Sequence, residues 1–262
     1  MPNCRALVVL FASSMCCSLI CGAATPGSDP QALKLAAQSI AVLTVRNSIS
    51  DVTLTGTVTW TSGPDSETGT ATLQALGSGE SRMDLALTSG MRTEIRDSQT
   101  GTPVGKWVNP DTHSGTFVFQ NCQTDAVWFF PALSSLKVPA NIVLSYIGQT
   151  TWNGHSAQHI QSYLYQPNAP SVVPSTQQLS TLDFYLDATT LLPIAVTFNA
   201  HPDNDAATSL LVEVDFSNYQ AMSGAMVPAH IQRYQEGTLM VDLTVTGAAF
   251  NTGLSLSAFA VD

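Results

Sequence analysis

The apolar residues of the N-terminal part follow the spacing of a helix. Asp29-Pro30 is typical of a helix start, because Asp can cap the first turn and Pro is tolerated within it. Apolar residues then recur at helical spacing from Leu33 to Leu43 and leave the other face polar. We therefore predict an amphipathic helix from Pro30 to about Arg46, which needs another element to cover its apolar face.

Beyond residue 50 the spacing changes to two. Between residues 52 and 60, apolar residues alternate with threonines, which predicts a strand with one buried face. Short segments of the same kind follow, separated by Gly, Asp and Asn, and this pattern is typical of an antiparallel meander. The pair Asn153-Gly154 predicts a tight hairpin turn. The further strands expected are Thr70–Leu76, Ser81–Leu87, Met91–Arg96, Val104–Val108, Ser114–Phe119, Ile142–Gln149, Ala157–Tyr165, Thr181–Leu186, Ile194–Asn199, Ser209–Tyr219, Val227–Tyr234 and Leu239–Ala249.

One aromatic segment, Asp125–Leu136, interrupts this meander and does not alternate. It predicts one or two short helices, with Pro131 at a helix start. We do not expect its three adjacent rings (Trp128, Phe129 and Phe130) all to face inward. Either one or two of them pack on the sheet, or the segment covers the mouth of an apolar cavity. A second irregular segment, Gln166–Gln178, contains three prolines and is expected to be a loop.

The chain begins with the three parts of a secretory signal. Arg5 precedes a largely apolar run from residue 6 to about residue 20, and the small residues Gly22-Ala23-Ala24 follow. We predict a signal peptide over residues 1–24 and a single domain over residues 25–262, in the periplasm or outside the cell. An uncleaved membrane anchor fits less well, and a lipoprotein anchor at Cys16 or Cys21 lacks the expected neighbours. No later segment is apolar for long enough to span a membrane.

Cysteine content and charge narrow the range of functions. Removal of the signal takes away Cys4, Cys16, Cys17 and Cys21, so only Cys122 remains and neither an intramolecular disulfide nor a multi-cysteine zinc site can form. Loss of Arg5 changes the net charge from −10 to −11. Such an acidic chain is a poor partner for nucleic acid.

No catalytic or cofactor motif is present, and we expect no cofactor, no metal and no catalytic residue. On a strand, residues four apart lie about 13 Å apart, too far for His155 and His159, or Asp183 and Asp187, to share an ion or a proton. The polar cluster His201–Asp205 is typical of a hairpin loop. An enzyme would require a cleft that brings the histidines together with carboxylates.

The last third of the chain resembles the outer-membrane lipoprotein-sorting (LolA/LolB-like) superfamily. The residues that carry the resemblance are Tyr185-Leu186-Asp187, Leu192-Pro193, Phe216-Ser217-Asn218-Tyr219 and Val227-Pro228. The resemblance implies a mainly β, α+β fold: a strongly curved antiparallel sheet, or incomplete β-barrel, with the N-terminal helix and the short helical segment over its open side. Members hold lipids or acyl chains on the concave face without catalysis.

The resemblance suggests a cavity and the residues around it. Carriers of this superfamily often use a basic residue near the cavity mouth, for which Arg82 and Arg92 are candidates. The loop at 166–178 and the acidic charge are departures that count against lipoprotein transfer itself. An alternative is a cell-envelope module with a closed core that binds another envelope protein. The residues expected to form the cavity wall and its lid are Val52, Leu54, Val58, Trp60, Met83, Leu85, Leu87, Trp128, Phe129, Phe130 and Leu133.

Overall fold

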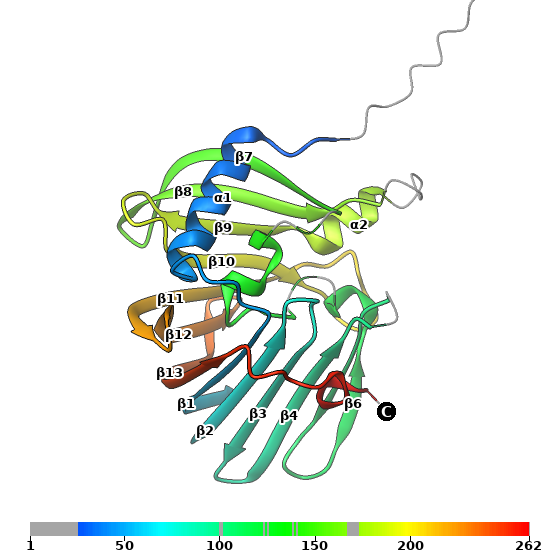
Figure 1. The fold of residues 1–262 in the computed structure, drawn as a ribbon. Coiled ribbons are helices and arrows are strands. Elements are labelled where there is room, and N and C mark those ends of the chain that lie inside the picture. Colours follow the sequence, from blue (N-terminus) through cyan, green and yellow to red (C-terminus); the bar gives the residue numbers. More distant parts are fainter. Residues whose placement is uncertain are drawn as a thin grey trace, which may run out of the picture.

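The computed structural model describes residues 26–99, 102–122, 124, 126–137, 139, 141–166 and 173–261 (Figure 1). The predicted signal peptide, with its four cysteines, lies outside these residues. Within the described ranges, no helix is both long enough and apolar enough to cross a membrane.

Thirteen antiparallel strands form one sheet in the order β6-β5-β4-β3-β2-β1-β13-β12-β11-β10-β9-β8-β7. Most of the expected strands form within a few residues of the predicted bounds. The first hairpin is longer than expected, because β2 pairs with β1 as far as Asp65. The strands are β1 (Asp51–Ser62), β2 (Asp65–Leu76), β3 (Ser81–Leu87), β4 (Gly90–Asp97), β5 (Val104–Val108), β6 (Ser114–Phe117), β7 (Ile142–Trp152), β8 (His155–Leu164), β9 (Leu182–Asp187), β10 (Pro193–Ala200), β11 (Leu210–Met222), β12 (Ala225–Gln235) and β13 (Thr238–Phe250).

Two meanders meet at the centre of this sheet. The first runs outward from β1 to the edge strand β6, and the second runs from the opposite edge strand β7 back to β13. β13 then pairs with β1 in antiparallel register, with Val58 opposite Leu243. The sheet curves strongly and is not closed into a barrel (Figure 1). The expected α+β fold with a curved antiparallel sheet is therefore confirmed.

Helix α1 (Pro30–Leu43) lies across the inner face of the sheet, over β7 to β10 (Figure 1). Asp29 caps it as predicted, since its carboxylate accepts two backbone N–H groups of the first turn at 2.6 and 3.2 Å. The helix ends before the expected Arg46. Val45 and Arg46 adopt positive φ angles of 49° and 63°, and this left-handed backbone cannot continue an α-helix.

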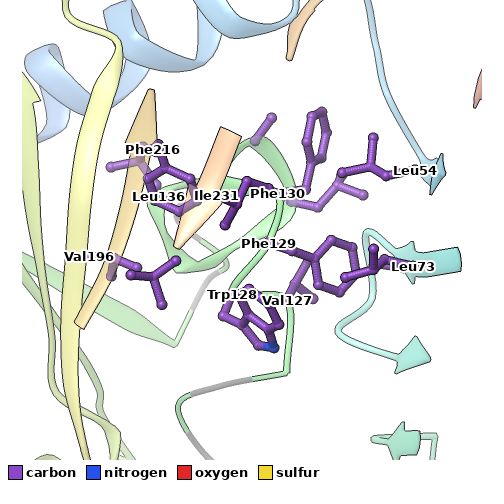
Figure 2. Packing of buried hydrophobic residues seen from close by; sticks show 14 of the residues in the cluster. Leu54, Leu73, Val127, Trp128, Phe129, Phe130, Leu136, Val196, Phe216 and Ile231 are labelled. Atoms are coloured by element: carbon purple, nitrogen blue, oxygen red, sulfur yellow. The ribbon is translucent and has the colours of Figure 1, made fainter. Parts of the chain in front are cut away.

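Residues 118–141, which we call the crossing segment, lead from β6 to β7 through the inside of the curve. Figure 2 shows part of it running between Leu54 and Leu73 on one side and Val196 and Phe216 on the other. Its helical content matches the prediction, with 3-10 helices at Pro131–Leu133 and Ser135–Lys137. Further 3-10 helices form at Phe119–Cys122 and Leu256–Phe259.

The three adjacent rings Trp128, Phe129 and Phe130 are all buried, so the expectation that at most two of them would face inward is wrong. Trp128 is 7% exposed, Phe129 1% and Phe130 0%. Because the sheet curves around the segment, side chains that leave it in different directions all meet apolar surface. Phe130 packs against Phe250 of β13 at a ring distance of 5.6 Å, while Trp128 meets Phe129 edge to face at 5.7 Å.

The expected loop at 166–178 is also partly wrong, because a short helix, α2 (Val173–Ser180), forms there. Its last residue fixes it to the sheet. The Ser180 hydroxyl donates to the carbonyl of Thr176 at 2.5 Å and accepts the N–H of Leu164 at 2.9 Å. A proline is compatible with the first turn of a helix, so the prolines alone did not show that this segment lacks a helix.

Candidate functional site

A cavity of about 490 Å³ lies beside the crossing segment on the inner face of the sheet. Its walls come from the inner faces of β9 and β10, the turn between β2 and β3, the end of β4, and the crossing segment. The described residues that line it are Gly77, Ser78, Gly79, Arg96, Asp97, Ser98, Thr102, Pro103, Phe119, Cys122, Thr124, Ala126, Val127, Trp128, Pro131, Leu133, Ser134, Ser135, Pro139, Asn141, Ile142, Leu164, Gln166, Ser180, Leu182, Phe184 and Val196.

The apolar wall of the cavity follows from the alternation of β9 and β10. Leu182 and Phe184 point to the inner face because successive side chains on a strand point to opposite faces. Val196 of β10 lies opposite Phe184 and continues the same wall. All three are at least nine-tenths buried and belong to the hydrophobic core, so the cavity is a gap at the edge of that core.

Several polar groups in the wall already have hydrogen-bond partners within the protein. The hydroxyl of Ser135 is 2.8 Å from that of Ser162, and Ser134 donates to the carbonyl of Pro131 at 2.7 Å. The hydroxyl of Ser180 is satisfied as well. A ligand without polar groups can therefore lie against these residues without leaving buried donors or acceptors unpaired.

Two of the residues expected from the sequence, Trp128 and Leu133, line this cavity. The others pack into the core, seven of them from the inner face of β1 and β3 and two from the crossing segment. Trp60 among them is only half buried. The remaining eight, all less than 9% exposed, are Val52, Leu54, Val58, Met83, Leu85, Leu87, Phe129 and Phe130.

Sequence reasoning did not name the β9–β10 wall or Arg96. The alternation in β9 was visible in the sequence and correctly predicted a strand, but alternation tells which face a residue occupies and not whether that face is filled. Arg96 follows Arg92 and Glu94 at a spacing of two on β4, so all three share the inner face.

Four charged residues form a cluster on this inner face, around Glu94. Three of them are arginines: Arg92, Arg96 and Arg233. Arg92 donates to Oε1 of Glu94 at 2.7 Å and lies over the ring of Trp60 at 4.3 Å. Burial raises the pKa of Glu94 and the charges of the three arginines lower it, and the net result is a pKa below the usual value. Glu94 is therefore ionised at neutral pH.

The two basic residues suggested by the resemblance are not in the cavity lining. Arg82 lies on the outer face, where it pairs with Asp84 at 2.6 Å. Arg92 is on the inner face but contacts Glu94 and Trp60. The arginine that lines the cavity is Arg96, which is 6% exposed.

The histidines lie away from the cavity lining. His159 pairs with Asp183 at 2.7 Å and His230 with Asp242 at 2.8 Å, both on the outer face. The buried His201 belongs to the β10–β11 loop, as expected, and its Nδ1 lies 2.8 Å from the carbonyl oxygen of Thr208. Across the described part of the chain, no three His, Cys, Asp or Glu side chains are grouped to hold a metal ion.

Comparison with solved structures identifies the fold. No protein-family model matches the chain, and no curated protein matches it by sequence. An outer-membrane lipoprotein-sorting protein domain from Vibrio parahaemolyticus is similar with a TM-score of 0.55 and 15% identity, over 87% of this chain and 95% of that one. A LolA superfamily protein from Nitrosomonas europaea gives 0.56 and 7%, over 88% and 97%. The expected resemblance to this superfamily is thus confirmed at the level of the fold.

Proposed function

We propose that the protein is an exported, non-enzymatic carrier that binds a lipid or another apolar ligand in the cavity. The observation that carries this proposal is the cavity itself. Its volume of about 490 Å³ falls in the range of about 300–1,000 Å³ that is typical of small-molecule sites. Its walls are largely apolar and its polar groups are largely paired.

The energetics favour an extended apolar ligand. Burial of ten methylene groups contributes roughly 8 kcal/mol before association costs are subtracted. Such a ligand needs few polar contacts, which agrees with a chain that has no recognisable catalytic motif. One structure of similar fold, which is named for lipoprotein sorting, supports a role of this kind.

The same proposal includes the location and the extent of the protein. The N-terminal pattern supports removal of residues 1–24 as a signal peptide, which would leave residues 25–262 as a single domain in the periplasm or outside the cell. A carrier in that location would have an apolar ligand and another envelope protein as its partners.

Native mass spectrometry of the mature protein purified from its own host tests the proposal. A bound lipid or other apolar molecule in stoichiometric amount, identified after organic extraction, is the expected result. A mass without ligand, together with no uptake of the uncharged apolar dye Nile red, would contradict the proposal.

A variant that fills the cavity localises the binding. Leu182→Trp adds volume at a wall position of β9, so we expect it to lose the ligand while its circular dichroism spectrum is unchanged. The matched control is Thr57→Trp, which introduces the same side chain at an exposed position of β1. Equal loss in both variants, or retention of ligand in Leu182→Trp, would place the ligand elsewhere.

The second candidate is a cell-envelope interaction module. It is favoured by the packing of most of the expected wall residues into the core, and by the edge strand β7, on which Ile147 is 53% exposed. A protein without ligand that co-purifies with one defined envelope protein would support this candidate over the carrier.

A further inference from the structure

Arg96 is a buried positive charge in the cavity wall. It is 6% exposed, and its guanidinium lies over the ring of Phe117, with Cζ 3.4 Å from the ring centroid. Gly105, opposite Arg96 on β5, makes room for this stack, since a Cβ there would come within 3.1 Å of Arg96 and 2.7 Å of Phe117. Stacking holds the guanidinium plane in place and directs its N–H groups along the edges of that plane.

The surroundings of Arg96 add further positive charge. Arg92 and Arg233 lie on the same inner face, and all three arginines act on the single carboxylate of Glu94. Arg233 lies over Trp128, with Cζ 5.3 Å from the ring centroid, and Trp128 is itself in the cavity wall. The cavity is thus connected to the arginine cluster through two of its lining residues, Arg96 and Trp128.

The rest of the described lining offers little other charge. Asp97 is its only carboxylate, and this side chain already accepts the backbone N–H of Gln99 at 2.9 Å. Asp97 also follows Arg96 directly on β4, so its side chain points to the opposite face. Beyond Arg96, the wall continues as the apolar side chains of Phe184 and Val196.

We propose that the ligand is an amphiphile with one anionic head group, which binds against Arg96 while its apolar chain lies along the β9–β10 wall. Arg96 also has contacts within the protein, so the head group would add to them or exchange with them. A carboxylate and a phosphate monoester share the geometry that a guanidinium recognises. This inference rests on the proposed function, because it describes the ligand of the same cavity.

The wild-type protein provides the first test. Laurate, dodecyl phosphate and dodecanol carry the same chain, so their ability to displace Nile red isolates the effect of the head group. We expect at least one of the two acids to bind about tenfold or more tightly than dodecanol, because a hydrogen bond to a charged group is stronger than one to a neutral group. The acid that binds more tightly identifies the head group as carboxylate or phosphate.

The outcomes separate the inference from the function on which it rests. Equal binding of dodecanol and both acids would overturn the anionic head group and leave the apolar cavity intact. Failure of all three compounds and of Nile red to bind would remove the proposed function and the inference together.

Variants then assign the preference to one residue. We expect Arg96→Gln to bind dodecanol as before and to lose the tenfold preference, and Arg96→Lys to keep part of it. Arg82→Gln is the matched control, since it removes an arginine from the outer face of the neighbouring strand β3. A preference that survives in a folded Arg96→Gln would contradict the assignment. If this variant fails to fold, the comparison of laurate, dodecyl phosphate and dodecanol in the wild-type protein still decides whether the ligand has an anionic head group.

Discussion

The indole N–H of Trp152 donates a hydrogen bond of 3.1 Å to Oδ1 of Asp215, although three strands separate β7 from β11 in the sheet. The tip of the β7–β8 hairpin therefore folds onto the outer face. There the Trp152 ring stacks on Tyr185 of β9 at 4.0 Å. Tyr185 and Asp215 both lie opposite Ala195 of β10, which is 0% exposed although it is on the outer face.

Trp152 should stabilise the fold through both its ring and its N–H group. We expect Trp152→Ala to lower the free energy of unfolding by about 2 kcal/mol, because it removes a half-buried aromatic ring and its hydrogen bond. Trp152→Phe keeps a ring for stacking and should lose only about 1 kcal/mol. Urea unfolding monitored by circular dichroism measures both. Thr151→Ala, at the exposed neighbouring position, should stay within about 0.5 kcal/mol of wild type.

The carboxylates of Glu213 and Asp215 lie side by side on the outer face of β11, and their proximity predicts a pH effect. The pKa of Glu213 is raised from 4.5 to about 6. Burial has the largest effect, followed by the charge of Asp215 and its hydrogen bond. The native state then holds this proton to a higher pH than the unfolded chain does. The contribution of Glu213 to stability should therefore fall as the pH rises from about 4.5 to about 6.

Replacement of Glu213 by Gln removes this titration. We expect Glu213→Gln to have a higher Tm than wild type at pH 7, with the difference shrinking towards pH 4. Differential scanning calorimetry across this range measures it. Parallel pH profiles for the two proteins would show that Glu213 ionises with the same pKa in the folded and unfolded states.

The sequence predicted well the elements that depend on near neighbours. Alternation identified β1, and Asn153-Gly154 forms the expected turn with positive φ angles of 46° and 83°. Pro131 begins a 3-10 helix as expected. These features depend on backbone preferences within a few residues, so they can be recognised without knowledge of the fold.

Features that depend on distant parts of the chain were harder to predict. Phe129 and Phe130 are buried because the two meanders join into one sheet that curves around the crossing segment. No local sequence pattern shows that the meanders join in this way. Seven of the expected wall residues lie on the inner face of β1 and β3, but whether a face holds core or cavity depends on how the crossing segment fills it. Arg96 was missed because an arginine in a strand is usually exposed to solvent.

Asp51 should hold the C-terminal residues against the start of β1. One of its oxygens accepts the N–H and the hydroxyl of Thr252 at 2.8 and 3.1 Å, and the other accepts the N–H of Gly253 at 3.0 Å. Burial raises the pKa of Asp51, but these hydrogen bonds outweigh it and leave the pKa below its usual value. Its stabilising effect is therefore present above the pKa of an unfolded aspartate and is lost as the pH falls through the lowered value.

The amide in Asp51→Asn retains only one of the two acceptor oxygens. We expect this variant to lose about 2 kcal/mol of stability at pH 7 and to show a smaller loss of stability in acid than wild type. Hydrogen exchange of the amides of residues 252 and 253 should accelerate. Unchanged exchange at these two amides would mean that the C-terminal segment is held by other contacts.

Phe130 should contribute more to stability than any surface ring, because it is fully buried where the crossing segment meets β13. It is 0% exposed and packs on Phe250, so Phe130→Ala would leave a cavity that its neighbours cannot fill. The expected cost is about 3–5 kcal/mol, and Phe130→Leu should cost less because it retains most of the volume. Met91→Ala, at a position that is 51% exposed, is the control and should change stability by less than about 0.5 kcal/mol.

Ligand binding should respond to Phe130 as well, although its ring does not line the cavity. Trp128 and Leu133, on either side of it in sequence, do line the cavity. Phe130 packs on Phe250 of β13, so a smaller side chain at this position should let this part of the crossing segment shift. We expect Phe130→Leu to keep the fold and to weaken the displacement of Nile red by laurate several-fold. If Phe130→Leu binds as tightly as wild type, the crossing segment keeps its position without this ring, and the cavity depends mainly on the β9–β10 wall.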